Sequence, residues 1–284
     1  MKLNIIKIFS IGALAVGIYT GCQPEDGGDG NGLTSANIEA SFTITPVAGK
    51  MNTYALKANE NGVLGVKWAK GDGSAASVGK AIDTVFFPDA GKYTIMLTAI
   101  GKGGEEKTTS QDVTVATSDP VAGNLIVGGK MEAADDAKWL RLPIGNGVDF
   151  ALAGGKMTAT GGGWGHKGIY QAVDVVAGKK YKVDMLVSGG GAVNTWFEVY
   201  VGTAVPEAGK DYSDGGKRLA LNTWAGCGNA NFNGKFSSVS CDAPAGNTVQ
   251  FATTGKVYLV IRTGGEYLGA NGISVDNVEF RGVK

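Results

Sequence analysis

Alternating apolar side chains between Trp164 and Gly202 constrain the fold more than any other feature of this chain. On both sides of the turn at 176–179, apolar residues alternate with others, interrupted only at Gln171: Ile169, Val173, Val175, Tyr181, Val183, Met185 and Val187. Period-two alternation is typical of antiparallel strands with one face on a core. The pattern therefore predicts two strands that meet at the turn, and a third strand at 196–201.

The third of these strands has an unusual outward face. Its apolar residues, which suit the core, are Phe197, Val199 and Val201. Because successive side chains of a strand point to opposite faces, Trp196, Glu198 and Tyr200 are expected to point outward. Two aromatic rings and a carboxylate on an outward face indicate a surface that contacts a ligand.

Composition narrows the class of protein. The 284 residues include 26 Lys and Arg and 26 Asp and Glu, so no net charge attracts nucleic acid or an anionic membrane surface. Glycine accounts for 47 residues without a fixed period, which excludes a collagen-like repeat and indicates short strands joined by tight turns. The length suggests about two domains. After residue 21, no segment approaches the ~18 apolar residues of a membrane-spanning helix.

Residues 1–21 have the pattern of an export signal. Lys2 and Lys7 precede an apolar run at 8–19, and Thr20-Gly21-Cys22 follows. This ending resembles a bacterial lipoprotein signal, although Tyr19 replaces the usual leucine. The resemblance implies that Cys22 carries lipid; the alternative is an ordinary signal peptide followed by a chance cysteine.

The segment 22–36 is rich in Gly and Asp and is predicted to be a flexible tether. Glu25 and Asp26, directly after Cys22, resemble the export signal of outward-facing lipoproteins in glycan-degrading Gram-negative bacteria. The resemblance implies a lipid-anchored protein on the cell surface, at the outer membrane. If Cys22 is lipidated, Cys227 and Cys241 remain as an even pair in an oxidising compartment, which predicts a disulfide.

Residues 37–117 show six or seven short alternating runs separated by turn clusters, with Trp68 among them. This pattern indicates an immunoglobulin-like sandwich with a buried tryptophan. The segments Trp68-Ala-Lys-Gly-Asp-Gly-Ser74 and Phe87–Leu97 resemble the polycystic-kidney-disease (PKD) domain family. In such proteins the module is usually a spacer, so Trp68 is expected in the core. A short linker at 118–123 follows.

Residues 124–284 contain about a dozen strand-like runs and no sustained helical periodicity, which predicts a jelly-roll β-sandwich. This unit resembles jelly-roll carbohydrate-binding modules, close to families 4, 9 and 22. The matching segments are Asn124–Glu132, Trp139, Gly168–Val173, Gly178–Val183 and Ile273–Phe280. Trp139, beside Leu140 and Leu142, is assigned to the core. Fold alone does not fix function, so the ligand needs a separate argument.

The same resemblance implies a structural Ca²⁺. In the resembling modules, a Glu after the first strand and an Asp before the final strand lie together as hard oxygen ligands. Glu132 and Asp276 occupy those positions, and backbone carbonyls would complete the shell. The alternative is that both carboxylates lie in solvent. No other cofactor is expected.

The candidate binding residues follow from the chemistry of sugars. A sugar ring stacks its C–H face on an aromatic ring, which removes about 50 Å² of apolar surface and contributes about 1 kcal/mol. A millimolar to micromolar ligand needs about −4 to −8 kcal/mol, so several aromatic rings must converge. The candidate rings are Trp164, Trp196, Trp224 and Tyr200. The candidate hydroxyl partners are Glu198, Arg262, His166 and Asn222.

Catalysis is not expected. His166 is the sole histidine, and the chain lacks a nucleophile elbow, a metal-ligand cluster and a phosphate loop. A glycosidase needs two carboxylates that flank the scissile bond. Glu198 has no acidic partner two or four residues along its strand, which leaves open only a partner from another strand.

The complete layout resembles the surface glycan-binding lipoproteins of polysaccharide-utilisation systems. The resemblance implies capture of a neutral polysaccharide, with a β-glucan favoured: β-1,3-glucan (laminarin) or mixed-linkage glucan. A neighbouring glycan transporter and a surface hydrolase would then use the bound chain. The alternatives are an adhesive or protein-binding surface lipoprotein, or a module for another neutral glycan such as xylan or mannan.

Overall fold

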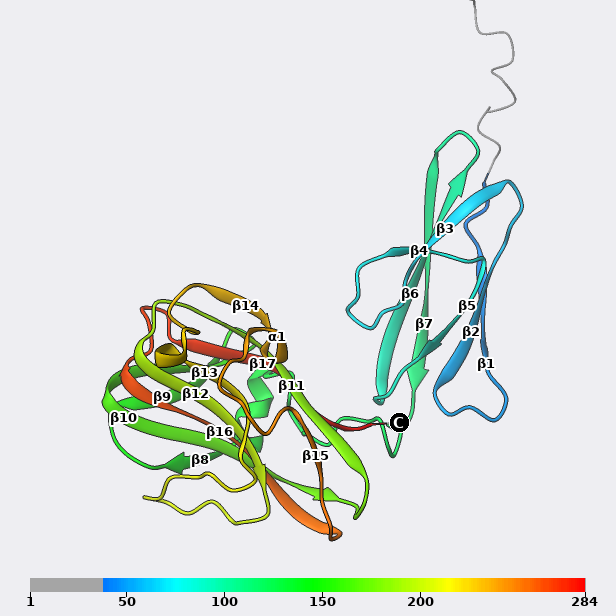
Figure 1. Cartoon of the computed structure of the whole chain (residues 1–284). Helices are drawn as coiled ribbons and strands as arrows, with labels where there is room; N and C mark the ends of the chain where they lie inside the picture. The colour runs from blue at the N-terminus through cyan, green and yellow to red at the C-terminus, as the bar shows by residue number, and fades with distance from the viewer. Residues whose placement is uncertain (1–37, 284) are drawn as a thin grey trace, which may run out of the picture.

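The computed structural model describes residues 38–283, which form two all-β units (Figure 1). The predicted signal segment at 1–21, the lipid site at Cys22 and the tether at 22–36 lie outside these residues. Within the described part of the chain, no helix has the length and apolar character needed to cross a membrane.

The first unit is a seven-stranded sandwich. Its strands are β1 (Phe42–Pro46), β2 (Thr53–Ala58), β3 (Val63–Ala69), β4 (Ser77–Gly79), β5 (Ile82–Phe86), β6 (Gly91–Gly101) and β7 (Glu106–Val115). Two antiparallel sheets, β1-β2-β5 and β4-β3-β6-β7, enclose an apolar core. Trp68 is 1% exposed, packs edge-on against Phe42 and donates its indole N–H to the carbonyl of Lys80. The prediction that Trp68 belongs to the core is confirmed.

The second unit contains ten strands and three short helical turns. The strands are β8 (Leu140–Pro143), β9 (Val148–Ala153), β10 (Lys156–Val175), β11 (Lys180–Gly189), β12 (Val193–Gly202), β13 (Lys217–Asn222), β14 (Phe232–Lys235), β15 (Thr248–Gln250), β16 (Gly255–Tyr267) and β17 (Ile273–Gly282). The helical turns are η2 (Ala133–Lys138), η3 (Thr223–Ala225) and α1 (Phe236–Val239).

Strand β10 belongs to both layers of this sandwich. Its residues 162–175 pair with β16 and, in part, with β8, and the order β8-β10-β16-β12-β13 forms what we term sheet 1. Its residues 156–161 pair with β9 and, in part, with β17, and the order β9-β10-β17-β11-β14 forms sheet 2. Strand β15 also pairs with β11. The long strand thus carries the chain from one layer to the other.

The turn at 176–179 joins strands that are not neighbours. Strand β10 ends in sheet 1, whereas β11 begins in sheet 2, and the two strands do not pair. Two strands do meet at this turn, as predicted, but each pairs with strands other than its neighbour in the chain. Alternation indicates which face of each strand is buried. Strands β10 and β11 lie in opposite layers, and each buries one face in the core between them. Alternation carries no information about which strand lies alongside.

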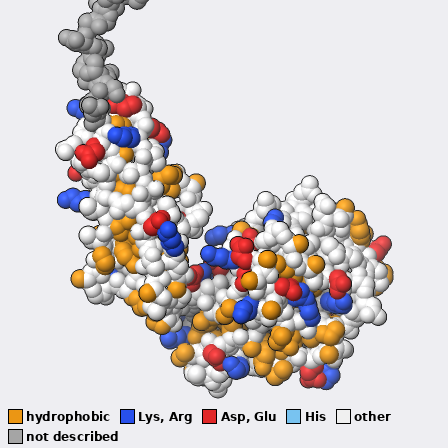
Figure 2. All heavy atoms as spheres, turned by 180° about the vertical axis from the view of Figure 1, so that it is seen from behind, with side chains coloured by type: hydrophobic (Ala, Val, Ile, Leu, Met, Phe, Trp, Pro, Cys, Tyr) orange, Lys and Arg blue, Asp and Glu red, His pale blue; other side chains and the backbone are white. Residues whose placement is uncertain are grey.

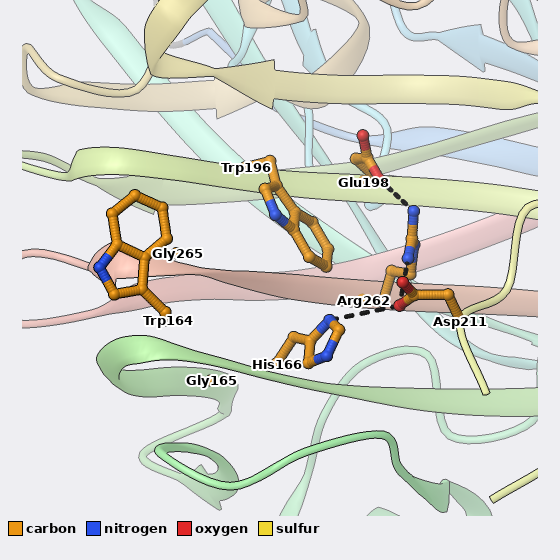
Figure 3. Close-up of a pocket in the computed structure, with 8 residues that line it drawn as sticks. All are labelled: Trp164, Gly165, His166, Trp196, Glu198, Asp211, Arg262 and Gly265. Atoms are coloured by element: carbon orange, nitrogen blue, oxygen red, sulfur yellow. Dashed lines mark hydrogen bonds and ion pairs between the residues drawn. The ribbon is translucent and has the colours of Figure 1, made fainter. Parts of the chain in front are cut away.

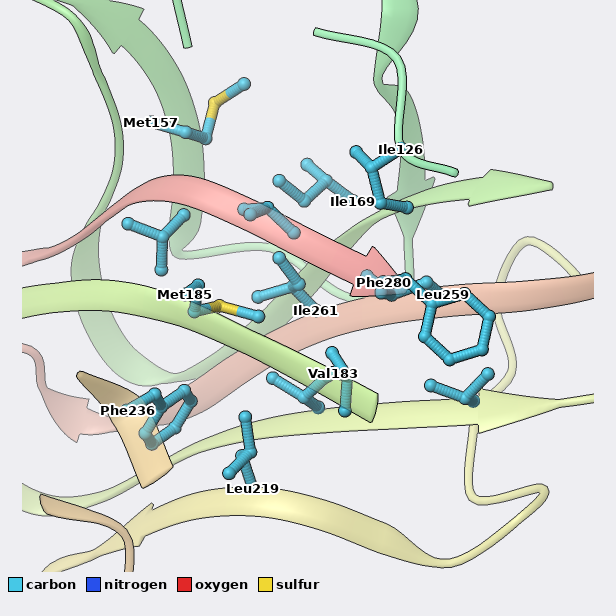
Figure 4. Packing of buried hydrophobic residues seen from close by; sticks show 14 of the residues in the cluster. Ile126, Met157, Ile169, Val183, Met185, Leu219, Phe236, Leu259, Ile261 and Phe280 are labelled. Atoms are coloured by element: carbon cyan, nitrogen blue, oxygen red, sulfur yellow. The ribbon is translucent and has the colours of Figure 1, made fainter. Parts of the chain in front are cut away.

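The main core fills the space between sheets 1 and 2 (Figure 4). Side chains from both layers interdigitate there, including Met157, Ile169, Val183, Met185, Leu219, Leu259, Ile261 and Phe280. Trp139 is 3% exposed and packs in this core, as predicted, with its indole N–H donated to the carbonyl of Gly128. Because the inward positions supply the core, the outward positions of each sheet are available for other tasks.

The C-terminal end of β17 returns to the first unit (Figure 1). Arg281 donates two hydrogen bonds to the carboxylate of Asp89, and the backbone N–H of Asn124 donates to the same carboxylate at 2.7 Å. Burial alone would raise the pKa of Asp89, but the hydrogen bonds from Arg281 and Asn124 outweigh it and lower that pKa. A charged contact therefore ties the first unit to the last strand of the second.

Candidate functional site

A hollow of about 310 Å³ opens on the outward face of sheet 1, at the end where β10, β12 and β16 approach the loops (Figure 3). We term it the tryptophan hollow. Its lining residues are Trp164, Gly165, His166, Trp196, Glu198, Asp211, Arg262 and Gly265. Five of the eight predicted ligand-binding residues therefore meet in one place.

Glycine at two outward positions creates the space. Gly264 of β16 pairs with His166 on one side and with Trp196 on the other. A Cβ at Gly264 would lie 2.5 Å from His166 Cβ and 2.9 Å from Trp196 Cζ2. In the next row, Gly168 stands beside Arg262, where a Cβ would lie 3.2 Å from that arginine's own Cβ. The bare backbone lets the larger side chains lean over the sheet.

Trp164 reaches solvent through a strained bulge. The β10–β16 register shifts between Gly162 and Gly165, and Trp164 within it has φ 63°, a conformation that costs a non-glycine residue energy. Its side chain is nevertheless 64% exposed. Burial does not repay this strain, which makes an exposed ring in this position a candidate functional feature.

Trp196 is half-buried and is held on one side by a cation. The guanidinium of Arg262 lies 4.6 Å from the centroid of the Trp196 ring, and the ring of His166 approaches it edge-on at 6.0 Å. A cation over the face of an indole stabilises both groups. The contacts fix the orientation of the Trp196 ring beside the more exposed Trp164 (Figure 3).

Arg262 organises the polar side of the hollow. Its guanidinium donates to Glu198 at 2.9 Å, to the Tyr200 hydroxyl at 3.1 Å and to Asp211 at 2.7 Å. Lys217 lies 3.8 Å from the other oxygen of Glu198. Burial opposes the charge of Arg262, but its contacts with Tyr200, Glu198 and Asp211 outweigh this effect and raise its pKa. The arginine is therefore a permanently charged, fixed donor.

Tyr200 has a supporting role that differs from the predicted one. It is 3% exposed, because Tyr212 packs against it from the loop at 203–216, together with Leu142 and Val260. Its hydroxyl donates to Glu198 at 2.8 Å. Burial raises the pKa of Tyr200 to about 12, which keeps the hydroxyl protonated as a donor. Tyr200 orients the carboxylate and offers no ring to a ligand.

Asp211 is the acidic residue that sequence reasoning missed. It belongs to the loop between β12 and β13, and its Oδ1 lies 3.2 Å from His166 Nδ1 as well as accepting from Arg262. Asp214 holds the same loop by accepting backbone N–H groups of Thr203 and Ala204. The only signal in the sequence was the neighbouring Tyr212, a lone large aromatic in a polar, glycine-containing loop.

Trp224 and Asn222 lie outside the tryptophan hollow. Trp224 is 57% exposed and sits in η3, whose N-cap is Asn222. The Asn222 amide accepts from the backbone of Trp224 at 3.1 Å and donates to Asp242 at 2.8 Å, so it holds the loop. The predicted disulfide between Cys227 and Cys241 is present and closes this loop.

The two carboxylates predicted to hold Ca²⁺ differ in their surroundings. Asp276 accepts from the backbone of Asn277 at 2.6 Å, whereas at Glu132 it is the backbone N–H that donates to Asp135, at the start of η2. Among residues 38–283, no group of three or more His, Cys, Asp or Glu side chains gathers as a metal site. A Ca²⁺ at Glu132 and Asp276 stays a prediction that depends on backbone ligands.

The tryptophan hollow suits recognition better than bond cleavage. Its two carboxylates, Glu198 and Asp211, both accept hydrogen bonds from the one guanidinium of Arg262. A glycosidase needs one carboxylic acid that donates a proton and a second, separate carboxylate. Two carboxylates that share one arginine instead form a rigid polar wall beside the indole rings.

Comparison with known proteins finds no matching family model and no matching curated protein. Among solved structures, a carbohydrate-binding module from a study of promiscuous specificity in the β-sandwich superfamily is 16% identical (TM-score 0.31; 85% of this chain, 97% of that chain). TmCBM61 in complex with β-1,4-galactotriose is 12% identical (TM-score 0.34; 56% and 99%). The PKD1 domain of Vibrio cholerae metalloprotease PrtV is 23% identical (TM-score 0.24; 28% and 95%). At such scores the likenesses carry no weight for the ligand.

Proposed function

We propose that the tryptophan hollow binds a neutral polysaccharide chain without cleaving it. The observation that carries the proposal is the exposed ring of Trp164, held by a strained backbone next to the half-buried ring of Trp196. Apolar rings at the rim of a polar hollow match a sugar, which has an apolar C–H face and a ring of hydroxyls.

The polar wall supplies directional contacts at low cost. Arg262, Glu198 and Asp211 are already fixed by one another, so a ligand does not have to order them. Placed polar groups of this kind set orientation and specificity in otherwise apolar sites. Stacking on one or two rings contributes about 1 kcal/mol each. Stacking therefore supplies at most about half of the ~4 kcal/mol that a millimolar ligand needs, and the hydrogen bonds of the polar wall must supply the rest.

Charge favours a neutral ligand. Two cations of the hollow's network, Arg262 and Lys217, face three carboxylates, Glu198, Asp211 and Asp242. Positive and negative side chains are also interspersed over the face of the molecule shown in Figure 2. An acidic polysaccharide would require an excess of positive charge, which this network does not provide.

The finer proposal is a β-glucan, with a β-1,3-linked chain favoured over a mixed-linkage chain. The resemblance of the layout to surface glycan-binding lipoproteins supports this choice, together with a lipid anchor at Cys22 on the outer membrane. The chain would then pass to a neighbouring transporter and surface hydrolase. Xylan, mannan or a protein partner are the alternatives that the experiment below separates.

The test is native affinity electrophoresis and isothermal titration with laminarin, mixed-linkage glucan, xylan and mannan. Replacing Trp164 by alanine should weaken binding of the preferred glycan at least several-fold. Trp224→Ala is the matched control, because it removes an equally exposed indole outside the hollow, and it should change binding less than twofold. Retardation by no glycan would refute the proposal and favour adhesion. Binding to xylan or mannan alone would retain the site and remove the glucan.

A further inference from the structure

A second hollow, of about 450 Å³, lies on the outward face of sheet 2, the layer opposite the tryptophan hollow. We term it the asparagine hollow. Its lining residues are Lys156, Ser188, Gly189, Gly190, Asn231, Phe232, Asn233, Asn271, Gly272 and Ser274. None of these residues takes part in the site described above.

Small polar side chains form a continuous row on the outward face of sheet 2, and three of them, Ser188, Asn233 and Ser274, line this hollow. Thr158 of β10 pairs with Ser274 of β17, Ser274 pairs with Ser188 of β11, and Ser188 pairs with Asn233 of β14. The residues between these positions, such as Val187 and Val275, are buried in the core. By alternation, the row therefore faces outward on four neighbouring strands.

Glycine leaves the next row without side chains. Gly190 follows β11 directly and Gly272 precedes β17 directly, each two residues beyond Ser188 and Ser274. A Cβ at Gly190 would lie 2.2 Å from Asn231 Oδ1, and a Cβ at Gly189 would lie 2.9 Å from Phe232 Cζ. A larger residue at Gly189 or Gly190 would therefore displace Phe232 or Asn231, which form the wall of the hollow.

The amide groups around this hollow are free to bind. In the part of the chain that the structure describes, the side chains of Asn231, Asn233 and Asn271 make no hydrogen bond to protein. Asparagines elsewhere in the unit, such as Asn194 and Asn222, bond to Glu266 and Asp242. A free amide presents two donors and one acceptor, which is the complement of neighbouring sugar hydroxyls.

We propose that the asparagine hollow is a second binding site for a neutral sugar chain, on the layer opposite the first. This inference takes its class of ligand from the proposed function. It adds a second binding site, and with it room for a second bound chain on each molecule of protein. No carboxylate lines the hollow, and its one charged residue is Lys156. Its floor of hydroxyls and amides would form few favourable contacts with an apolar ligand. A polysaccharide, which carries hydroxyl groups along its whole length, can form hydrogen bonds across this floor.

The two sites should differ in strength and act together. The asparagine hollow has no exposed indole, so binding there depends on hydrogen bonds that compete with water and is weaker. A polysaccharide that engages both layers, or two chains that each engage one, gains avidity without any new contact. The module would then hold an insoluble or branched glycan more firmly than a single short oligosaccharide.

The experiment uses the exported protein without its signal segment and a β-1,3-gluco-oligosaccharide, or whichever glycan retards the wild type on native gels. The variants are Asn231→Ala/Asn233→Ala/Asn271→Ala, Trp164→Ala, and Asn247→Ala as control. Asn247 also lacks a side-chain bond within the described chain and lies outside the hollow. The replaced amides make no hydrogen bond to the described part of the protein, so the triple variant should melt like the wild type.

The triple variant should lose retardation on polysaccharide gels several-fold while it keeps the affinity of the tighter oligosaccharide site. In the Trp164→Ala background, NMR signals of the three asparagine side-chain amides should still shift on titration with the oligosaccharide. Unshifted amides up to the solubility limit, with unchanged retardation of the triple variant, would overturn the second site and leave the first intact. Failure of every glycan to bind the wild type would overturn both.

Discussion

The two outward faces of the second unit share a backbone device and differ in what surrounds it. On sheet 1, Gly264 opens space between His166 and Trp196, and on sheet 2, Gly190 opens space beside Asn231. The first hollow is walled by indole rings and an ion-paired network, and the second by free amides and hydroxyls. A sandwich core uses only inward positions, so each face can acquire its own recognition chemistry.

The two faces also differ in how much their side chains contribute to the stability of the fold. Arg262, Glu198 and Tyr200 are largely buried and bonded to one another, so the tryptophan hollow is part of the folded framework. The amides of the asparagine hollow make no hydrogen bond to the described part of the protein. Substitutions on sheet 1 should therefore change folding and binding together, whereas substitutions on sheet 2 should change binding alone.

Removal of Arg262 should have the largest effect. Arg262→Ala removes the nearest cation from the buried Glu198 carboxylate and leaves it only the Tyr200 hydroxyl and the more distant Lys217. This should lower the free energy of unfolding by about 3 kcal/mol and abolish glycan binding. Urea denaturation measures the first quantity and isothermal titration the second. Arg262→Lys keeps the charge but not the fork of donors, so it should recover part of the stability. A loss below 1 kcal/mol for Arg262→Ala would contradict the coupling of this face to the fold.

Loss of the disulfide should come next. The bond joins Cys227, which follows β13 and η3, to Cys241, 14 residues later, which follows β14 and α1. In the chain-entropy model, closing such a loop contributes about 3 kcal/mol, and engineered or native bonds often deliver less. Cys227→Ser/Cys241→Ser should therefore lower the melting temperature. Since Trp224 lies outside the tryptophan hollow, the glycan affinity of this variant should change little. A large loss of affinity would mean that the loop around Trp224 contributes to the binding site.

Filling the space at Gly264 should have an intermediate effect. A Cβ there meets the backbone oxygen of Gly165 at 2.7 Å in addition to His166 and Trp196, so relief requires movement of the sheet. Gly264→Ala should cost about 1–3 kcal/mol and weaken binding, as overpacking does elsewhere. Gly65→Ala is the matched control, since that strand glycine of the first unit has open space around it. Equal melting temperatures for the two variants would show that the hollow tolerates filling.

The parts of the site that could be predicted are those set by strand periodicity. Alternation along 196–201 predicted that Trp196 and Glu198 point outward, because the face of each side chain follows directly from the sequence. The fold class followed for the same reason, from short alternating runs and glycine-rich turns. Alternation did not predict which strands pair, and β10 and β11 lie in different layers.

The parts that could not be predicted depend on loops that fold back over a sheet. Asp211 reaches Arg262 across 51 positions, and no local pattern in the loop announces that contact. The same loop covers Tyr200 with Tyr212, which turned an expected ligand contact into a buried support. Trp224 shows the converse, because exposure of a loop tryptophan does not reveal the direction in which it points.

The smallest predicted effect concerns a second arginine–carboxylate contact, between the two units. Asp89 and Arg281 are more exposed than Glu198 and Arg262, so their pair should contribute about 1 kcal/mol, near the upper value for exposed pairs. The pKa of folded Asp89 lies below its ordinary value because the bonds from Arg281 and Asn124 outweigh the opposing effect of burial. Its contribution is therefore complete above the ordinary pKa and is lost as the pH falls through the folded pKa.

Asp89→Asn tests this contact with little change in shape. The variant should lose about 1 kcal/mol at neutral pH, and its deficit relative to the wild type should shrink as the pH falls below the ordinary carboxylate range. Urea denaturation of both proteins from neutral to acidic pH measures the difference, and glycan titration should show equal affinity. A deficit that stays constant across this range would mean that the amide fails for steric reasons. A loss of unfolding free energy as large as that of Arg262→Ala would contradict this ranking. It would mean that the pair of Asp89 and Arg281 stabilises the protein as much as the pair of Glu198 and Arg262.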